Sequence, residues 1–112
     1  MIGPFRVLVV DDDSETLALL REILVKEGYE VSTAENADAA LREATRQEPD
    51  VVLTDIQMPG MDGVALLAEL RTRLPKTLVI LATAYGSLKT AVDGIKAGAF
   101  DYLAKPFIID DV

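Results

Sequence analysis

The chain has 112 residues and a formal charge of −8, and half of its residues are hydrophobic. This suits one globular domain with a modest core, and the acidic charge argues against direct nucleic-acid binding, which needs basic patches. Cysteine and histidine are both absent, which excludes disulfides, thiolate metal sites and imidazole chemistry, so a metal site would have to use oxygen ligands. No apolar run approaches the ~18 residues of a membrane span, and a signal-peptide pattern is absent, so we expect a soluble cytoplasmic protein without a membrane partner.

Short apolar runs alternate with amphipathic segments along the chain. The runs have the length of buried strands, and the amphipathic segments repeat their apolar residues at helical spacing. In chain order we expect a strand at Phe5–Val10, a helix through Leu17, Leu20 and Leu24, a strand at Val31–Ala34, a helix through Ala40, Leu41 and Ala44, a strand at Val51–Thr54, a helix through Leu66, Leu67 and Leu70, a strand at Leu78–Ala82, a helix through Leu88, Val92 and Ile95, and a strand at Ala99–Leu103.

Residues that can cap a helix stand before each expected helix, at Asp13, Asn36, Asp62 and Ser87. Gly28 follows the first helix and predicts its end. Strands and helices therefore alternate, and the central strands are apolar throughout, as in a sheet covered on both faces. We expect an α/β domain with a parallel sheet and right-handed crossovers.

The last five residues, Ile108-Ile109-Asp110-Asp111-Val112, have the pattern of a helix that has only begun. We expect this fifth helix to be truncated. Residues 1–112 are then a single domain that forms part of a longer chain.

Polar side chains gather where the expected strands end. Asp11, Asp12 and Asp13 follow the first strand, Asp55 follows the third, Thr83 follows the fourth, and Lys105 comes shortly after the fifth. Ligands of open α/β sheets bind outside the carboxyl ends of the strands, so these groups are expected to meet in one pocket. Carboxylates there can hold a Mg²⁺-like cation, and one of them can serve as a phosphoryl acceptor.

Each residue also has a structural interpretation when it is taken alone. Asp13 is best explained as a helix cap, Asp11 and Asp12 could be solvated loop charges, and Asp55 could form a turn. Tyr102, on the last strand, fits core packing. The functional interpretation depends on the combination, because each polar residue stands at the end of a different strand.

Four segments together resemble the receiver domain of two-component response regulators: "VLVVDDDSE", "PDVVLTDIQMPGMDG", "ILATA" and "GAFDYLAKPF". They cover Arg6 to Phe107. The last segment is most similar to receivers of sigma-54-dependent, nitrogen-regulation-type transcriptional activators. The resemblance implies a flavodoxin-like, doubly wound, five-stranded parallel sheet with strand order 2-1-3-4-5.

The resemblance also implies roles for the acidic residues. Asp55 matches the phosphoacceptor that takes a phosphoryl group from a sensor histidine kinase. Asp12 matches a direct Mg²⁺ ligand, and Asp11 matches an acidic partner that acts largely through water. The metal set, for Mg²⁺ or alternatively Mn²⁺, then comprises Asp11, Asp12, Asp55 and the backbone carbonyl of Gln57.

Further roles fall on the later strands. Lys105 matches the lysine that pairs with the acceptor carboxylate and then with a phosphoryl oxygen, and its bond to Pro106 is expected to be cis. Thr83, with Ala84 beside it, matches the switch position that moves onto the phosphoryl group. Tyr102 matches the aromatic that turns inward when Thr83 moves. Phosphorylation is then expected to control an output module, such as a sigma-54 activator ATPase. The resemblance leaves open whether the domain forms a homodimer.

Two other functions are weighed against the switch. A phosphatase of the haloacid-dehalogenase kind also uses an aspartate nucleophile and Mg²⁺, but it requires Asp-x-Asp with Thr or Val two residues further on. Asp11-Asp12-Asp13 has Glu15 at that place, and Asp55-Ile56-Gln57 lacks the second acid. The other alternative is a domain that only binds partners and keeps a vestigial pocket. We expect a phosphoacceptor rather than an enzyme with a separate substrate.

Overall fold

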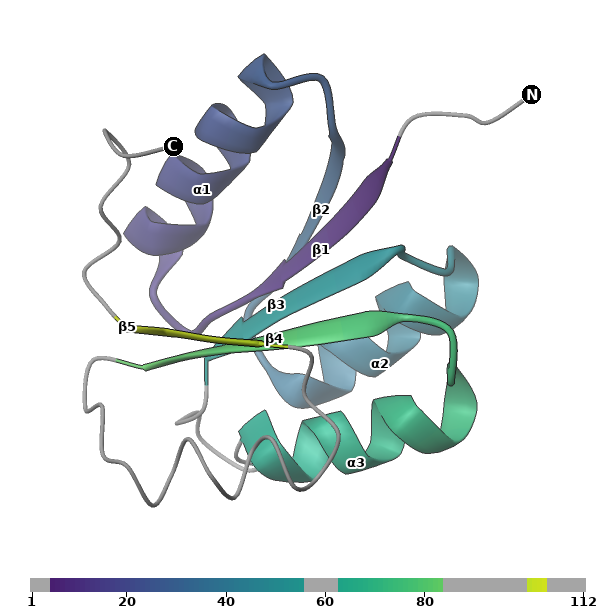
Figure 1. The fold of residues 1–112 in the computed structure, drawn as a ribbon. Helices are drawn as coiled ribbons and strands as arrows, with labels where there is room; N and C mark the ends of the chain where they lie inside the picture. Colours follow the sequence, from purple (N-terminus) through teal and green to yellow (C-terminus); the bar gives the residue numbers. More distant parts are fainter. Residues whose placement is uncertain (1–4, 56–62, 84–100, 105–112) are drawn as a thin grey trace.

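The computed structural model describes residues 5–55, 63–83 and 101–104, with the backbone alone for residues 63, 64, 82, 83 and 101–104. Strands and helices alternate along the chain for most of its length (Figure 1). The elements are β1 (Arg6–Val10), α1 (Ser14–Lys26), β2 (Glu30–Ala34), α2 (Ala37–Arg46), β3 (Val51–Asp55), α3 (Gly63–Arg73), β4 (Leu78–Thr83) and β5 (Asp101–Ala104).

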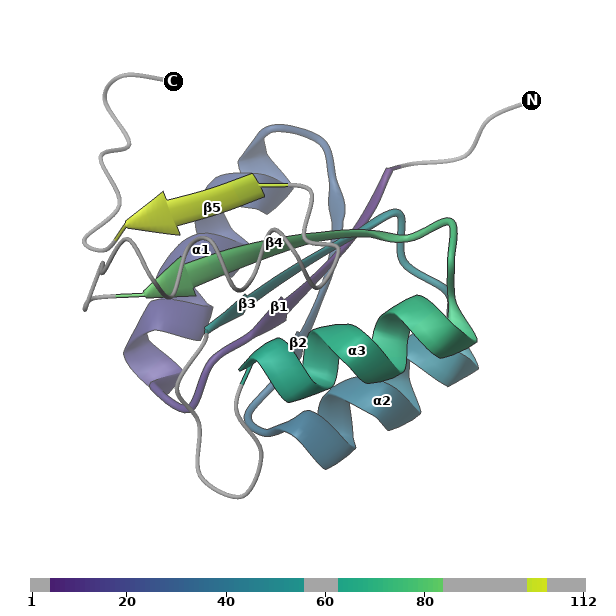
Figure 2. The same ribbon diagram turned by 60° about the horizontal axis from the view of Figure 1, so that its bottom comes forward.

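The strands form one parallel sheet in the order β2-β1-β3-β4-β5. Helix α1 lies on one face of this sheet, and α2 and α3 lie side by side on the other (Figures 1 and 2). The predicted α/β class with a parallel sheet is confirmed. The expected helix through Leu88, the caps Asp62 and Ser87, and the truncated fifth helix lie outside the described residues.

Strand β1 supplies both faces of the core. Leu8 and Val10 pack in the cluster that includes α2 and α3, whereas Val7 and Val9 pack with Leu17 and other residues on the α1 side. Successive side chains of a strand point to opposite faces, so a strand at the centre of a two-sided core must be apolar at every position. This explains the uninterrupted run "VLVV".

The described helix ends follow the predicted capping chemistry. The Asp13 side chain accepts hydrogen bonds from the Glu15 backbone N–H (3.2 Å) and the Thr16 hydroxyl (2.7 Å) at the start of α1. The Asn36 side chain accepts a hydrogen bond of 2.8 Å from the Ala39 N–H at the start of α2. The predicted caps Asp13 and Asn36 are therefore confirmed, and each satisfies backbone donors that the first helical turn leaves unpaired.

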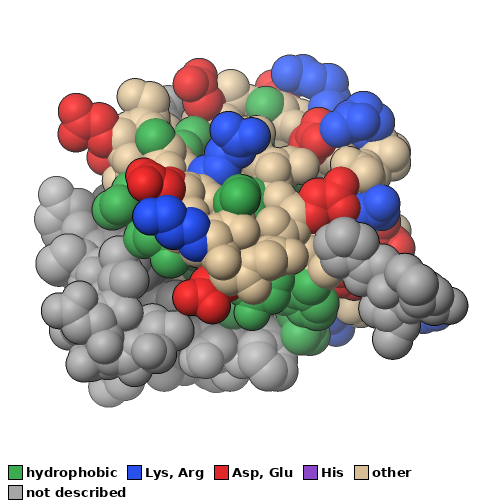
Figure 3. Space-filling model, turned by 90° about the horizontal axis from the view of Figure 1, so that it is seen from above, with side chains coloured by type: hydrophobic (Ala, Val, Ile, Leu, Met, Phe, Trp, Pro, Cys, Tyr) green, Lys and Arg blue, Asp and Glu red, His purple; other side chains and the backbone are tan. Residues whose placement is uncertain are grey.

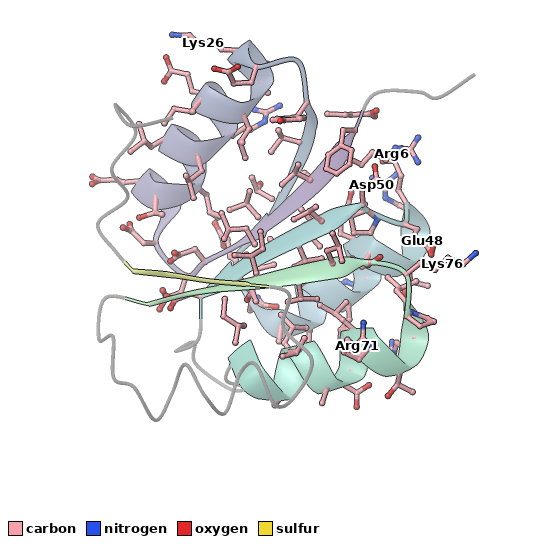
Figure 4. The ribbon with its side chains drawn as sticks, in the orientation of Figure 1. Arg6, Lys26, Glu48, Asp50, Arg71 and Lys76 are labelled. Carbon is pink, nitrogen blue, oxygen red and sulfur yellow. The ribbon has the colours of Figure 1, made fainter. Side chains whose placement is uncertain are left out.

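Asp50 joins two strands at the edge of the sheet where they begin. Its carboxylate accepts a hydrogen bond of 2.8 Å from the Arg6 backbone N–H, and its own N–H donates to the Arg6 carbonyl at 2.9 Å. Figure 4 shows Arg6 and Asp50 together at this edge. The start of β1 is thus held level with the start of β3, and this register determines which residues come level at the other edge.

None of the helices in the described part of the chain has the length and hydropathy that a membrane crossing requires.

Candidate functional site: an acidic pocket at the carboxyl edge of the sheet

The pairing of β1 with β3 brings the acidic residues together. Val10 pairs with Thr54 in the parallel register, so Asp11 and Asp12 leave β1 at the level where Asp55 ends β3. The site therefore combines two loop residues that follow one central strand with the last residue of its neighbour. This is the edge at which the sequence places the pocket.

Asp11 is fixed by backbone contacts on both sides. Its N–H donates to the Ala34 carbonyl of β2 at 3.1 Å, and its carboxylate accepts a hydrogen bond of 2.9 Å from the Asp13 N–H. Only 3% of the residue is exposed. A buried carboxylate with a fixed backbone donor is held in one orientation, so Asp11 forms the rigid wall of the pocket.

Asp11, Asp12 and Asp55 each direct a carboxylate oxygen into a group whose atoms all lie within 4.8 Å of one another. Asp11 is buried, Asp55 is half-buried and Asp12 is exposed. Partial desolvation, a side-chain hydrogen bond with Asp11 and the charges of Asp11 and Asp55 all raise the pKa of Asp12. The neighbouring carboxylates therefore disfavour ionisation of Asp12, and a bound cation would relieve this repulsion.

The donor set fits a hard divalent cation. Oxygen ligands that converge from more than one element suit Mg²⁺, which usually takes one or two carboxylates and keeps several waters. Asp13 lies next to this group in sequence, but its carboxylate caps α1. The contacts of the side chains therefore assign Asp13 to the helix cap and Asp11, Asp12 and Asp55 to the pocket, as the sequence predicts.

The other predicted site residues are placed only in part. Thr83 is the last residue of β4, and its backbone pairs with Ala104 at the carboxyl edge of the sheet. Tyr102 lies within β5 and pairs with Leu81. Four more predicted residues lie outside the described part of the chain: Gln57, Ala84, Lys105 and Pro106.

Thr54, which the sequence predicts only as part of a strand, lies directly before Asp55 and contacts its backbone. It is fully buried, and its hydroxyl donates a hydrogen bond of 3.1 Å to the Asp55 carbonyl. A hydroxyl within an apolar strand, directly before Asp55, is the sequence signal that could have indicated it.

An open, parallel α/β sheet with a pocket at the carboxyl ends of its strands defines the class of doubly wound α/β domains, which bind their ligands at that edge. Within that class, the chain belongs to the response regulator receiver domain family, whose model matches residues 7–112. The family predicted from the four sequence segments is thereby confirmed.

Two curated transcriptional regulators illustrate the relationship. The chain is 43% identical to the regulatory protein AtoC of Escherichia coli over 96% of its own length and 23% of AtoC. It is 47% identical to the DNA-binding transcriptional regulator NtrC of Salmonella typhimurium over 94% of its length and 22% of NtrC. The chain thus spans less than a quarter of either relative, and the similarity to NtrC agrees with the predicted nitrogen-regulation type.

Solved receiver structures share the fold. A CheY-like receiver domain protein from Methanospirillum hungatei has a TM-score of 0.92 and 36% identity, over 97% of this chain and 87% of that one. A Burkholderia pseudomallei response regulator with a phosphorylated aspartic acid, calcium ion and citrate gives 0.89 and 33%, over 96% and 63%. The beryllofluoride-activated NtrC4 receiver domain dimer gives 0.89 and 38%, over 95% and 88%.

Proposed function

We propose that this domain is a phosphoryl-accepting switch and that Asp55 is its acceptor. The observation that carries the proposal is the convergence of the Asp11, Asp12 and Asp55 carboxylates within 4.8 Å at the carboxyl edge of the sheet. Family membership gives this convergence its meaning, and a related protein is known with a phosphorylated aspartic acid and a calcium ion.

The transfer is an in-line displacement at phosphorus. A carboxylate oxygen of Asp55 attacks the phosphoryl group of a phosphohistidine, the new O–P bond forms as the N–P bond breaks, and the histidine nitrogen keeps the bonding electron pair. The product is an acyl phosphate, a mixed anhydride that water later hydrolyses. Asp55 suits this role because it lies at the end of a strand, half-buried, with one side open to the pocket.

Mg²⁺ is the proposed cation, with Mn²⁺ as the alternative, held by Asp11, Asp12, Asp55 and the carbonyl of Gln57. When bound, the cation would offset charge on the oxygens of the transferring phosphoryl group. Asp11 positions the site through its fixed carboxylate, and Asp12 supplies the exposed ligand.

The remaining roles follow the family pattern. Lys105 pairs with the acceptor carboxylate and then with a phosphoryl oxygen. The peptide bond between Lys105 and Pro106 is cis. Thr83 and Ala84 contact the phosphoryl group, and Tyr102 turns inward when Thr83 moves. The complete flavodoxin-like sheet with strand order 2-1-3-4-5 belongs to the same proposal.

The partners belong to the same proposal. A sensor histidine kinase donates the phosphoryl group, and a transcriptional output module, such as a sigma-54 activator ATPase, reads the phosphorylated state in the cytoplasm. A receiver homodimer is one form that this output can take, because the NtrC4 receiver is known as an activated dimer. The domain itself has no separate substrate to turn over.

The test is labelling with radioactive acetyl phosphate in the presence of Mg²⁺. Wild type should acquire a label that hydroxylamine removes, as expected of an acyl phosphate, whereas Asp55→Asn should not. Glu48→Gln is the matched control, because it removes one exposed carboxylate between α2 and β3, at the opposite edge of the sheet (Figure 4).

Three outcomes would contradict the proposal. Equal, stable labelling of wild type and Asp55→Asn would mean that another residue accepts the phosphoryl group. Steady turnover of a generic phosphate ester would favour the phosphatase. Absence of both labelling and Mg²⁺ binding would favour an interaction-only domain.

A further inference from the structure

The carboxylate of Asp13 is held at both of its oxygens at the start of α1. One oxygen accepts a hydrogen bond of 3.2 Å from the Glu15 backbone N–H, which is the contact of an ordinary helix cap. The other oxygen accepts a hydrogen bond of 2.7 Å from the Thr16 hydroxyl. Capping requires only the first of these contacts, so Thr16 adds a constraint on the orientation of Asp13 that the helix itself does not need.

The backbone of Asp13 is linked to the acidic pocket. Its N–H donates to the Asp11 carboxylate at 2.9 Å, and this carboxylate belongs to the group that converges with Asp12 and Asp55 within 4.8 Å. The peptide group that carries this N–H joins Asp12 to Asp13, so fixing it also restricts the backbone of Asp12. One peptide group therefore connects the first turn of α1 with two of the pocket carboxylates.

Helix α1 gives this connection a rigid support. Leu17, which directly follows Thr16, is buried with Val7 and Val9 of β1 on the α1 side of the sheet. The Leu17 N–H also donates to the Asp13 carbonyl at 3.1 Å. Figure 1 shows the short connection from the end of β1 to the start of α1. Core packing thus fixes the position of Thr16 relative to the strand that leads into the pocket.

The residue type at position 16 determines where the Asp13 N–H bonds. In a capping box, a Glu or Gln three residues after the cap accepts a hydrogen bond from the backbone N–H of the cap residue. Thr16 stands at this third position, but its hydroxyl donates to the Asp13 carboxylate. The Asp13 N–H bonds to Asp11 instead. The first turn of α1 therefore does not compete with the pocket for this donor.

Each contact has a common local explanation when it is taken alone. An Asp side chain often accepts a hydrogen bond from the N–H two residues further on, as Asp11 and Asp13 both do. These turns do not explain why the same residue receives the Thr16 hydroxyl and donates to a pocket carboxylate. Metal ligands are commonly held in place by an outer layer of hydrogen bonds, and the loss of an outer partner weakens metal binding.

We propose that Thr16 is a positioning residue for the metal pocket and that it acts through Asp13. Its hydroxyl fixes the Asp13 carboxylate, and the Asp13 N–H then holds the Asp11 carboxylate toward Asp12 and Asp55. The affinity for a divalent cation therefore depends on a threonine that is not itself a ligand. This role of Thr16 rests on the metal site of the proposed function, and it adds a residue of α1 to the parts that determine metal affinity.

The experiment is a titration of the full chain with Mn²⁺, followed by electron paramagnetic resonance of the free ion. Thr16→Val keeps the shape of the side chain but removes the donor, and Thr16→Gln supplies a capping-box acceptor that competes for the Asp13 N–H. Each should raise the Mn²⁺ dissociation constant by about tenfold, the lower end of the effect of an outer hydrogen-bond partner. Thr16→Ser keeps the hydroxyl and should bind Mn²⁺ within about twofold of wild type.

Thr16→Gln separates metal binding from stability. Because Gln at this position is compatible with the helix cap, the melting temperature in EDTA should stay within about 4 °C of wild type. A purely structural contribution of Thr16 would lower metal affinity only where the fold itself is weakened. Reduced Mn²⁺ affinity in a variant that keeps its thermal stability therefore indicates positioning. Circular dichroism should show that every variant is folded.

Thr45→Val is the matched control. The Thr45 hydroxyl also donates a short hydrogen bond within a helix, of 2.7 Å to the Leu41 carbonyl, but where α2 approaches the start of β3 (Figure 1). This variant should bind Mn²⁺ like wild type, whereas Asp12→Asn should lose most of the binding, which assigns the signal to the pocket.

Non-specific binding of cations should be the same in all of the threonine variants. The chain carries a charge of −8, and acidic side chains are interspersed with basic ones on the described surface seen in Figure 3. None of the threonine substitutions changes this charge, so differences in Mn²⁺ affinity among them do not come from the general attraction of an acidic protein for cations.

Three kinds of result would overturn the proposal. Equal Mn²⁺ affinity of wild type, Thr16→Val and Thr16→Gln would mean that the hydroxyl does not position the pocket. A loss in Thr16→Ser or Thr45→Val as large as in Thr16→Val would mean that the effect is not specific to this hydrogen bond. Failure of wild type to bind Mn²⁺, or full binding by Asp12→Asn, would reject the metal pocket of the proposed function as well, whereas the first two results leave that function intact.

Discussion

The hydroxyl of Thr54 donates a hydrogen bond to the backbone carbonyl of Asp55 at 3.1 Å, inside the sheet and shielded from solvent. Asp55 is the last residue of β3, so its carbonyl belongs to the peptide group at which the chain leaves the sheet. A fixed peptide at this point fixes the orientation of the Asp55 backbone. We infer that Thr54 is a positioning residue for the acceptor.

Substitution at Thr54 should separate positioning from stability. Thr54→Val keeps the volume but removes the donor, which should lower the free energy of unfolding by about 1 kcal/mol. Thr54→Ser keeps the donor and loses a buried methyl group, which also costs about 1 kcal/mol. The labelling rate with acetyl phosphate should fall about three- to tenfold in Thr54→Val only. Similar slowing in both variants would indicate a purely structural role.

The raised pKa of Asp12 gives a second prediction, for the protein without metal. Because the folded chain holds the Asp12 proton more tightly than the unfolded chain does, the free energy of unfolding should fall as pH rises from 3.8, the ordinary pKa, through the raised value. At neutral pH the penalty is fully present. Asp12→Asn should therefore raise the melting temperature in EDTA by about 2–4 °C.

The control for this measurement is Glu48→Gln, which changes the net charge equally but far from the pocket. The difference between Asp12→Asn and wild type should also shrink below pH 3.8, where Asp12 is protonated in both states. A lower or unchanged midpoint for Asp12→Asn at neutral pH would mean that the carboxylates do not strain the fold.

Addition of Mg²⁺ should make wild type more stable than Asp12→Asn, the reverse of the order without metal. Mg²⁺ binds the folded pocket, so a concentration of 100 times its dissociation constant should stabilise wild type by about 2.7 kcal/mol. Asp12→Asn and Asp55→Asn lose a ligand and should gain much less at the same concentration. Thermal melts across a Mg²⁺ titration provide the measurement, with Glu48→Gln again as control. Equal stabilisation of all four proteins would place the metal outside the pocket.

The central part of the fold could be predicted from sequence because local and global signals agree there. The run Val7–Val10 is apolar on both faces and Asp13 and Asn36 are favourable helix caps, and the structure confirms each of these features. The acidic pocket followed from one rule, that parallel strands present their carboxyl ends at the same edge of a sheet. That rule needs no knowledge of side-chain geometry.

The features that sequence did not predict depend on three-dimensional contacts. The bond from Thr54 to Asp55 requires the burial that two neighbouring strands create, and the bond between the Thr77 hydroxyl and the Pro49 carbonyl, at 2.8 Å, joins residues far apart in the chain. The nearness of Arg42 and Arg73, which line one hollow between α2 and α3, is similar, because the two residues come from different helices. Their proximity follows from helix packing, which no local pattern encodes.

The end of α1 provides a last prediction, on stability alone. Gly28 has φ +94° and follows the cap residue Glu27, and the N–H groups of Gly28 and Tyr29 bond to the Val25 (3.0 Å) and Leu24 (3.1 Å) carbonyls. A Cβ atom at Gly28 would meet nothing within 4 Å, so the cost of Gly28→Ala is conformational and not steric crowding by neighbours. Urea unfolding should show a loss of about 1 kcal/mol. Gly28→Asn should lose less, because asparagine tolerates positive φ better. An alanine variant as stable as wild type would mean that α1 can end in another conformation.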